Sequence, residues 1–513
     1  MGTTDGTGIQ LHDTRTGTLT ELVPREPGEV HMYTCGPTVY DYTHIGHLRP
    51  ALVADVLARH LRRRGYRVLW VSNFTDVDDR IIARANGEGI TPGALAQRYI
   101  NDYLENMAAL GVRGVDRYAR VTEHIPDVVA MVERLLAGGY AYAVDGDVYF
   151  AIESKADYGK LSGRTLGEMQ AGARVAVDPR KRHPMDFALW KAAKPEEPSW
   201  PSPWGPGRPG WHIECSAMSL RYLGDNFDVH GGGDDLIFPH HENEIAQSEA
   251  FTGSQPFVRI WLHNAMVQAG REKMSKSLGN FVRLTDLVRL YPAGVLRHFV
   301  LSTHYRKPLQ YSTSALEEAR KAWGRLGLAR RAWRAALSPA APVVRDGAAA
   351  RIEIVRTEPP TAAVPAADAA GRDLGEVVQR AEQGFSGALD EDLNTAGALG
   401  HLFDLVRAGN AALASGAGEA LGAALVVLQE CGDVLGLWEG EAQDGIALGT
   451  TRAAGLVELL IDLRGEARAY RDWAMADRIR RGLADLGVSL ADTPQGTRWT
   501  WPEPAAPTGG DGQ

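Results

Sequence analysis

The sequence predicts an α/β protein built on a parallel sheet, and three neighbouring segments carry this prediction. Residues 29–35 (EVHMYTC) are β-rich and apolar at alternate positions, as expected of a strand. Residues 49–65 have apolar side chains at helical spacing, with Pro50 near the start and Gly65 at the end, which are typical start and stop signals. Residues 66–76 (YRVLWVSNFTD) form a second apolar run. Strand, helix and strand make a βαβ unit, whose two strands lie parallel.

Later segments continue the same alternation. Residues 226–238 (NFDVHGGGDDLIF) predict another strand, and residues 239–251 (PHHENEIAQSEAF) predict a helix. Residues 257–267 (FVRIWLHNAMV) predict a further strand. We expect these segments to rejoin the first sheet.

Length and composition narrow the class of protein. A chain of 513 residues is too long for one core, so two to four domains are expected. No apolar run reaches the ~20 residues of a membrane span, and the N-terminus lacks a signal-peptide pattern, so a cytoplasmic protein is expected. Its three cysteines are widely separated, which argues against a disulfide framework, and we assign Cys431 to core packing. The net charge of −9 means that a polyanion would need local basic patches.

Two regions interrupt the α/β pattern. Residues 118–207 contain a predicted strand at 145–153 (DGDVYFAIE) but are otherwise loop-rich, and they are expected to form an inserted module. After about residue 313 the chain becomes helical and rich in Ala, Arg and Leu. An Ala/Pro-rich stretch at 338–372 interrupts these helices and is typical of a flexible insertion or linker.

Two short motifs suggest phosphate chemistry. His44-Ile-Gly-His47 lies where the first strand leads into its helix, and a helix start offers unbonded N–H groups and a positive dipole end to an anion. Gly46 would let a ligand approach the backbone, although two surface histidines explain the motif equally well. Residues 273–277 (KMSKS) suit a mobile clamp for polyphosphate. A solvated basic loop is the commoner case for KMSKS alone, but the upstream histidines favour the clamp.

A metal site is the third candidate. Cys35, Cys215, His240 and Glu244 supply the ligand types of a tetrahedral zinc site, and the last two lie on one helix face. No C-x-x-C motif supports the site, and buried free cysteines are the commoner case. His241 is an alternative ligand, although it would point about 100° away from His240 around the helix.

The two phosphate motifs, in this order, resemble those of the class I aminoacyl-tRNA synthetases. Longer stretches resemble the cysteinyl-tRNA synthetases within that class: MYTCGPTVYDYTHIGH, NFTDVDDRII, PGWHIECSAMS, FDVHGGGDDLIFPHHENEIAQSEA, REKMSKSLGNF, DEDLNTAGAL and DTPQGTRW. The resemblance runs from about residue 10 to about residue 500 and misses only the Ala/Pro-rich stretch and the ends.

The resemblance implies a domain order. An N-terminal extension (1–24) precedes a Rossmann-like catalytic domain (25–117 and 208–269), which contains an inserted connective module (118–207). After it come a stem-contact region with the KMSKS loop (270–322), a helical bundle (323–445), a small anticodon-binding domain (446–502) and a disordered tail (503–513). The inserted module is too short and loop-rich for an editing domain.

The resemblance also implies roles for individual residues. The zinc ligands would be Cys35, Cys215, His240 and Glu244; the amino-acid pocket would include Gly36, Thr75 and Trp211; ATP would be bound by His44, Gly46, His47, Asp235 and Lys276; the catalytic groups would be His44, His47, Lys273 and Lys276; and Arg468, Asp477 and Asp492 would read the anticodon.

The expected reaction is the ATP-dependent ligation of L-cysteine to tRNA(Cys) through a cysteinyl-adenylate, by a monomer. The implied cofactors are one Zn²⁺ per chain, which separates sulfur from oxygen because it binds a thiolate, and Mg²⁺ with ATP. Two alternatives stay open: a ligase that joins cysteine to a glucosaminyl-inositol, and a non-catalytic module that binds tRNA.

Overall fold

The computed structural model describes residues 8–165, 167, 178–269, 272–273, 282–337, 369–416, 421–439, 460–461, 463–464, 467–468, 472–485, 488–493 and 496–500. The chain divides into two units, residues 1–439 and residues 440–513. In the part of the chain described, no helix is long and apolar enough to cross a membrane.

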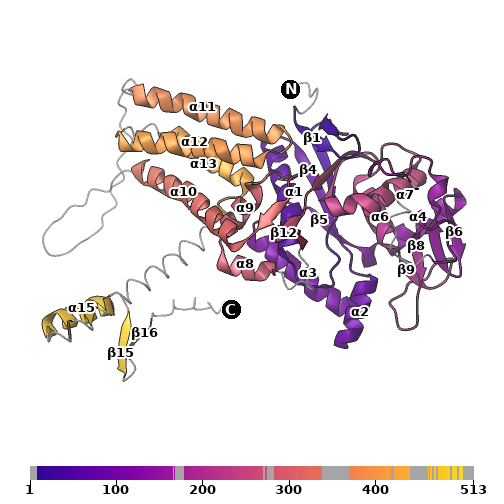
Figure 1. Ribbon diagram of the computed structural model, residues 1–513, viewed down its shortest axis with the longest axis horizontal. Helices are drawn as coiled ribbons and strands as arrows, with labels where there is room; N and C mark the ends of the chain where they lie inside the picture. Colours follow the sequence, from indigo (N-terminus) through magenta and orange to yellow (C-terminus); the bar gives the residue numbers. More distant parts are fainter. Residues whose placement is uncertain are drawn as a thin grey trace, which may run out of the picture. The chain divides into compact units, whose positions relative to one another are not determined.

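A parallel five-stranded sheet organises the first unit and confirms the predicted fold class (Figure 1). Its strands, in spatial order, are β11 (Val258–Asn264), β10 (Phe227–Gly233), β3 (Glu29–Thr34), β4 (Arg67–Phe74) and β5 (Arg117–Arg120). All the pairings are parallel, so the carboxyl ends of the strands meet at one edge. In sheets of this kind, ligands bind at that edge.

Helices cover the two faces of this sheet. They are α1 (Ile45–Arg63), α2 (Asp79–Glu88), α3 (Pro92–Ala109), α6 (Trp211–Leu223) and α7 (Glu242–Thr252), with short turns η3 (Asp234–Leu236) and η4 (Ile237–His241) before α7. Helices α1 and α3 share one hydrophobic core with the strands, and α6 and α7 contribute to another on the opposite face.

Helix α1 begins at Ile45, earlier than its apolar spacing predicts. His44 caps it, because its Nδ1 accepts a hydrogen bond from the Gly46 N–H at 3.0 Å. Pro50 therefore lies inside the helix rather than at its start. The predicted stop is correct: the helix ends at Arg63, and Gly65 has a φ of 89°, which a residue without a Cβ adopts readily.

The inserted region forms a small module whose core is shared with α6 and α7. An antiparallel sheet, in the order β6 (Ala141–Val144), β7 (Asp147–Phe150), β8 (Phe187–Ala192) and β9 (Gly207–Pro209), packs with α4 (Ile125–Ala137) and the short turn η2 (Ile152–Ser154). The short turn η1 (Val121–Glu123) precedes α4, and its Val121 belongs to the core beneath the main sheet. Strand β5, which straddles the boundary expected at residue 118, pairs with β4 of the main sheet.

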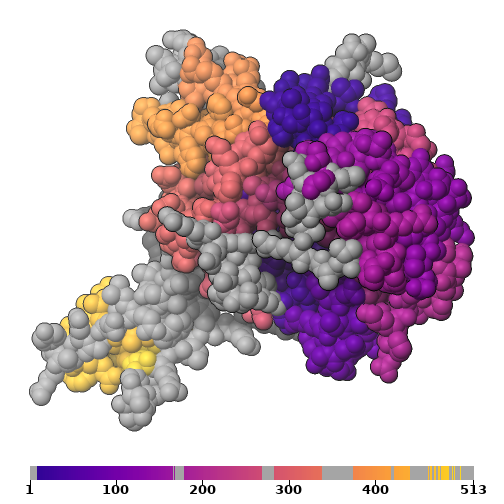
Figure 2. All heavy atoms as spheres, turned by 45° about the vertical axis from the view of Figure 1, so that its right-hand side comes forward, coloured from indigo at the N-terminus to yellow at the C-terminus, as the bar shows by residue number. Residues whose placement is uncertain are grey.

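The rest of the first unit joins the N-terminus to a helical bundle. It comprises the hairpin β1 (Gln10–Asp13) and β2 (Thr18–Glu21), the small sheet β12 (Val267–Ala269), β13 (Glu272–Lys273) and β14 (Leu309–Tyr311), and the helices α8 (Leu284–Leu290), α9 (Ala293–Leu301), α10 (Thr313–Leu337), α11 (Ala369–Asp390), α12 (Thr395–Ala414) and α13 (Leu421–Leu435). Figure 2 shows the N-terminal residues in indigo against the orange helices, where the Asp392 carboxylate accepts from the His12 N–H at 2.9 Å. Residues 338–368 of the insertion expected at 338–372 lie outside the described residues.

The second unit contains α15 (Trp473–Asp485) and a hairpin of β15 (Ser489–Thr493) and β16 (Gly496–Thr500). Leu483 and Val488 form its small described core.

His298 of α9 makes stability sensitive to acid. It is buried, and neither ring nitrogen finds a hydrogen-bond partner among the described residues. Burial, with the charge of Arg325, lowers its pKa to about 4. An unfolded histidine has a pKa of about 6.5, so between these values the unfolded chain binds a proton that the folded chain does not. Stability is therefore complete above pH ~6.5 and declines as the pH falls toward 4.

We expect the free energy of unfolding to drop by about 1 to 3 kcal/mol more in the wild type than in His298→Leu when the pH falls from about 7 to about 4.5. Urea unfolding at the two pH values measures this difference. Parallel losses in the two proteins would contradict the assignment.

Candidate active site

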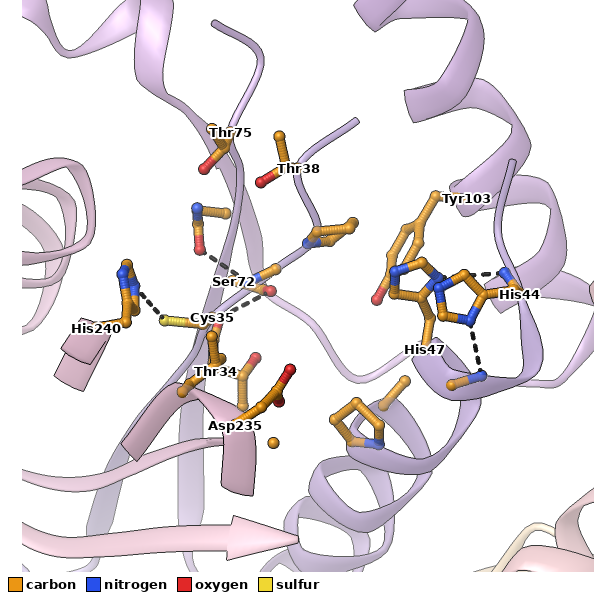
Figure 3. A pocket seen from close by; sticks show the side chains of 18 of the residues that line it. Thr34, Cys35, Thr38, His44, His47, Ser72, Thr75, Tyr103, Asp235 and His240 are labelled. Carbon is orange, nitrogen blue, oxygen red and sulfur yellow. Dashed lines mark hydrogen bonds between the residues drawn. The ribbon is translucent and has the colours of Figure 1, made fainter. Parts of the chain in front are cut away.

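A cavity of about 660 Å³ opens at the carboxyl edge of the main sheet. Residues from the ends of β3 and β4, the start of α1, the first residues of α6 and the segment after β10 line it. Figure 3 shows Cys35, His240 and Thr75 toward one end and His44, His47 and Tyr103 toward the other. The cavity therefore joins the candidate metal ligands to the histidine motif.

The four predicted metal ligands lie together although they come from three distant segments. Candidate ligand atoms of Cys35, Cys215, His240 and Glu244 all lie within 4.8 Å of one another. The Cys35 Sγ is 3.6 Å from the Cys215 Sγ and 3.4 Å from the His240 Nε2, and the His240 Nε2 is 3.0 Å from the Glu244 Oε1. Two sulfurs, one imidazole and one carboxylate fit a tetrahedral zinc site by ligand type.

A second set of ligands overlaps the first. Cys35, His230, His241 and Glu244 also meet the 4.8 Å criterion. The His230 Nε2 is 3.0 Å from Glu244, and the His241 Nε2 is 3.3 Å from the Cys35 Sγ, so these distances do not separate the two sets. Cys35, Cys215 and His240 line the cavity, whereas His230 and His241 do not. A substrate in the cavity could reach a metal bound by the first set, so the geometry favours that set.

The four side chains of the first set strongly shift one another's pKa values. A hydrogen bond from Cys35 lowers the pKa of Cys215 to about 6, while burial, followed by the proximity of Cys215, raises the pKa of Cys35 well above its usual value. Burial opposes the charged forms of Glu244 and His240. Even so, the charges of His230 and His240 lower the pKa of Glu244 to about 2, and those of Glu244 and Cys215 raise the pKa of His240 to about 10. A divalent cation would replace the protons that remain on these ligands.

The turn before α7 places the two ligands of the third segment. Residues Ile237–His241 form a π-helical turn, a geometry often found at functional sites. His240 lies in this turn and Glu244 in the first turn of α7, at i and i+4. The ring of Trp211, the first residue of α6, lies 4.4 Å from the His240 ring at 32°. The cavity wall thus includes an aromatic ring packed on a candidate ligand.

The histidine motif is built differently from the prediction. The Ile45 N–H donates to the Val282 carbonyl, and the Gly46 and His47 N–H groups donate to the Nδ1 and the carbonyl of His44. The first N–H groups of α1 are therefore engaged, and the expectation that they bind an anion directly is wrong. Gly46 is required for a different reason, because a Cβ there would lie 2.6 Å from the His44 ring.

The two imidazoles are a different kind of candidate donor. The His44 N–H donates to the His47 Nδ1 at 3.2 Å, so both rings accept at Nδ1. A neutral ring that accepts at Nδ1 carries its proton on Nε2. Burial, with the charge of His44, lowers the pKa of His47 well below its usual value, so His47 is neutral at pH 7. Both residues line the cavity, where an Nε2–H can donate to a phosphoryl oxygen.

The residues expected in the amino-acid pocket lie at the metal end of the cavity. Gly36 follows β3, and a Cβ there would lie 1.6 Å from the Asn73 carbonyl oxygen, so the close approach of β3 and β4 requires glycine. Thr75 follows β4, is buried, and donates from its hydroxyl to the Glu214 Oε2 at 2.7 Å. Asp235, expected near ATP, is exposed on η3 and also lines the cavity.

Several predicted residues are not placed at this cavity. Lys273 lies in β13, but its side chain is not described, and Lys276 lies outside the described residues. In the second unit, Arg468 is exposed, Asp477 is exposed on α15, and Asp492 lies in β15 opposite Thr497, with an undescribed side chain.

Sequence reasoning missed two polar residues beside the metal ligands. His230, within the quoted motif FDVHGGGDD, contacts Glu244 from β10, and Glu214 precedes Cys215 and bonds Thr75. Their motifs were noticed, but only the folded chain shows which neighbour each side chain contacts. Burial, with the charge of Cys215, raises the pKa of Glu214 well above its usual value.

Known proteins match this chain over most of its length. A model of the tRNA synthetases class I (C) catalytic domain matches residues 21–321, and a DALR domain model matches residues 384–439. The chain is 50% identical over 505 residues to the cysteine–tRNA ligase of Pelotomaculum thermopropionicum, covering 96% of this chain and 99% of the relative. It is 48% identical over 497 residues to the cysteine–tRNA ligase of Heliobacterium modesticaldum, with the same coverage.

Solved structures of other synthetases share the fold. A Mycobacterium tuberculosis methionyl-tRNA synthetase in complex with methionyl-adenylate has a TM-score of 0.56 at 17% identity, covering 80% of this chain and 90% of that one. A leucyl-tRNA synthetase of Agrobacterium radiobacter, in a ternary complex with tRNA, has a TM-score of 0.56 at 13% identity, covering 81% and 86%.

Proposed function

The chain belongs to the cysteine–tRNA ligase family of class I aminoacyl-tRNA synthetases, and from this membership we propose that a zinc ion bound by Cys35, Cys215, His240 and Glu244 selects its amino acid. The protein ligates L-cysteine to tRNA with ATP, which removes the two alternatives left open by the sequence. The observation that carries the zinc proposal is the convergence of two sulfurs, an imidazole and a carboxylate, of which the cysteines and the histidine line the cavity.

These residues fit zinc because thiolate and imidazole ligands together suit this ion. When bound, zinc lowers the pKa of a thiol and binds the resulting thiolate. The hydroxyl of serine is much harder to deprotonate and binds zinc more weakly. Trp211 packs on His240 and the Asn73 side chain accepts from the Gly36 N–H at 2.9 Å, so this end of the cavity is held in shape before cysteine binds.

The other end of the cavity is suited to ATP. The Nε2–H groups of His44 and His47 would donate to the α-phosphate while the cysteine carboxylate attacks it in line and pyrophosphate leaves. Their contribution is electrostatic and positional, as is general for phosphoryl and nucleotidyl transfer. Lys273 and Lys276 would act on the departing pyrophosphate, Asp235 on ATP, and Mg²⁺ would accompany the nucleotide.

The second step transfers the cysteinyl group to the 2′-hydroxyl of the terminal adenosine of tRNA(Cys). We assign recognition of the anticodon to residues 446–502, where Arg468 and Asp477 are exposed and can bond unstacked bases, as could Asp492. The catalytic domain (25–117 and 208–269) carries the chemistry, and the inserted module (118–207) needs no editing role if the metal supplies the selectivity.

Two measurements test this proposal. Metal analysis of the purified full chain should find about one zinc per chain, as expected for one four-ligand site. Cysteine-dependent exchange of ATP and pyrophosphate, and charging of a tRNA with a GCA anticodon, should disappear with a strong chelator and return with added zinc. A fully active chain without bound metal would contradict the proposal.

A further inference from the structure

A buried carboxylate lies directly behind the amino-acid end of the cavity. Glu214 is 1% exposed, and its Oε2 accepts from the Thr75 hydroxyl at 2.7 Å. No ion pair of the described residues includes it, and an ionised carboxylate without a cation is costly to bury.

Thr75 has its other polar groups occupied. Its N–H donates to the Pro37 carbonyl at 3.2 Å, and its carbonyl accepts from the Val39 N–H at 3.2 Å. Its hydroxyl hydrogen is committed to Glu214, so only the lone pairs of Oγ1 stay available as acceptors. Figure 3 shows Thr75 at the same end of the cavity as Cys35 and His240.

An amino acid in this cavity presents three polar groups. If its thiol lies at the metal ligands and its carboxylate faces the phosphate end, the α-ammonium needs an acceptor near the metal end. An ammonium has three donors and no acceptor, so it suits a hydroxyl oxygen whose own hydrogen points away. A carboxyl group behind that hydroxyl strengthens the contact because the first hydrogen bond polarises the hydroxyl oxygen for the second.

We propose that Glu214 is a positioning residue that orients the Thr75 hydroxyl as an acceptor for the α-ammonium of the amino-acid substrate. This assignment rests on the proposed placement of the thiol at the metal ligands. It gives the pocket selectivity for an α-amino acid over other thiols, in addition to the selection of sulfur.

The test compares L-cysteine with 3-mercaptopropionate, which has the thiol and the carboxylate but no ammonium. In the full metal-bound chain, Glu214→Gln should raise the KM for cysteine in pyrophosphate exchange by about 10- to 100-fold, the usual loss for a charge-assisted hydrogen bond, with little change in kcat. The inhibition constant of 3-mercaptopropionate and the zinc content should stay unchanged. A collapsed pocket or a lost metal would instead weaken both thiols.

A double-mutant cycle shows whether Glu214 acts through Thr75. Thr75→Val should raise the KM for cysteine as much as Glu214→Gln, Thr75→Ser should restore it, and Glu214→Gln should add nothing to Thr75→Val. Asp186→Asn is the matched control, because Asp186 is a buried carboxylate that accepts from the Tyr142 hydroxyl at 2.7 Å in the inserted module and does not line the cavity. It should leave both thiol constants unchanged.

The outcomes separate this inference from the zinc proposal. An unchanged KM in Glu214→Gln, equal weakening of the two thiols, or additive effects in the cycle would overturn the role of Glu214. Failure of 3-mercaptopropionate to inhibit the wild type would count against thiol binding at the metal, while the cycle would still decide the role of Glu214.

Discussion

Replacing Cys215 with alanine is expected to remove the bound zinc and to lower the preference for cysteine over serine by about 10⁴-fold or more, the scale on which a site built for one polar group rejects its analogue. Cys215 supplies one of the two sulfurs of the cavity-lining ligand set, 3.6 Å from that of Cys35. Without it, three ligands remain, and nothing in the pocket distinguishes a thiol from a hydroxyl strongly by shape. Metal analysis and pyrophosphate exchange with each amino acid measure the two effects.

Cys431→Ala is the matched control for this experiment. Cys431 is also a buried free thiol, but it packs among the apolar side chains of the helical bundle. Its replacement should leave the zinc content and the selectivity intact. If Cys215→Ala selects cysteine as well as the wild type does, the zinc account of specificity fails.

Two neighbouring histidines distinguish the overlapping ligand sets within the same experiment. His240→Ala should abolish stoichiometric zinc, whereas His241→Ala should retain it with an affinity lower by about 10- to 100-fold, the usual effect of a residue outside the ligand shell. The reverse pattern would place the metal among Cys35, His230, His241 and Glu244.

Replacing His47 with alanine is expected to lower the kcat of cysteine activation by about 10²- to 10³-fold, the usual loss of one donor to a charge that develops in the transition state. The KM for cysteine should change little, because His47 lies at the other end of the cavity from the metal ligands (Figure 3). Since the pKa of His47 lies well below its usual value, its ring stays neutral and its titration should not limit kcat near neutral pH.

Substitution of His47 by glutamine or by asparagine separates the two roles of its ring, acceptance at Nδ1 and donation from Nε2–H. Asparagine can imitate the Nδ1 that accepts from the His44 N–H, and glutamine can place an N–H donor near the position of Nε2. We therefore expect His47→Gln to keep more activity than His47→Asn, while His47→Asn keeps more of the thermal stability. Equal activity in both variants would argue against donation by Nε2–H.

The sequence by itself determined the class of fold and the candidate metal ligands. Apolar alternation at residues 29–35 and helical spacing after it depend on which faces are buried, and this pattern is local enough to be seen without coordinates. Cys35, Cys215, His240 and Glu244 could be named because thiols, an imidazole and a carboxylate in long family-like motifs indicate zinc.

Only the tertiary structure decided how those groups act. The capping of α1 by His44 engages the backbone N–H groups that the motif seemed to offer, and Glu214 becomes relevant only because α6 places it beneath Thr75. His230 and His241 likewise become possible ligands only once β10 and the turn before α7 bring them to Cys35. The physical reason is the same in each case: donors, acceptors and charges act over a few ångströms, and the partners here are separated by tens to hundreds of residues along the chain.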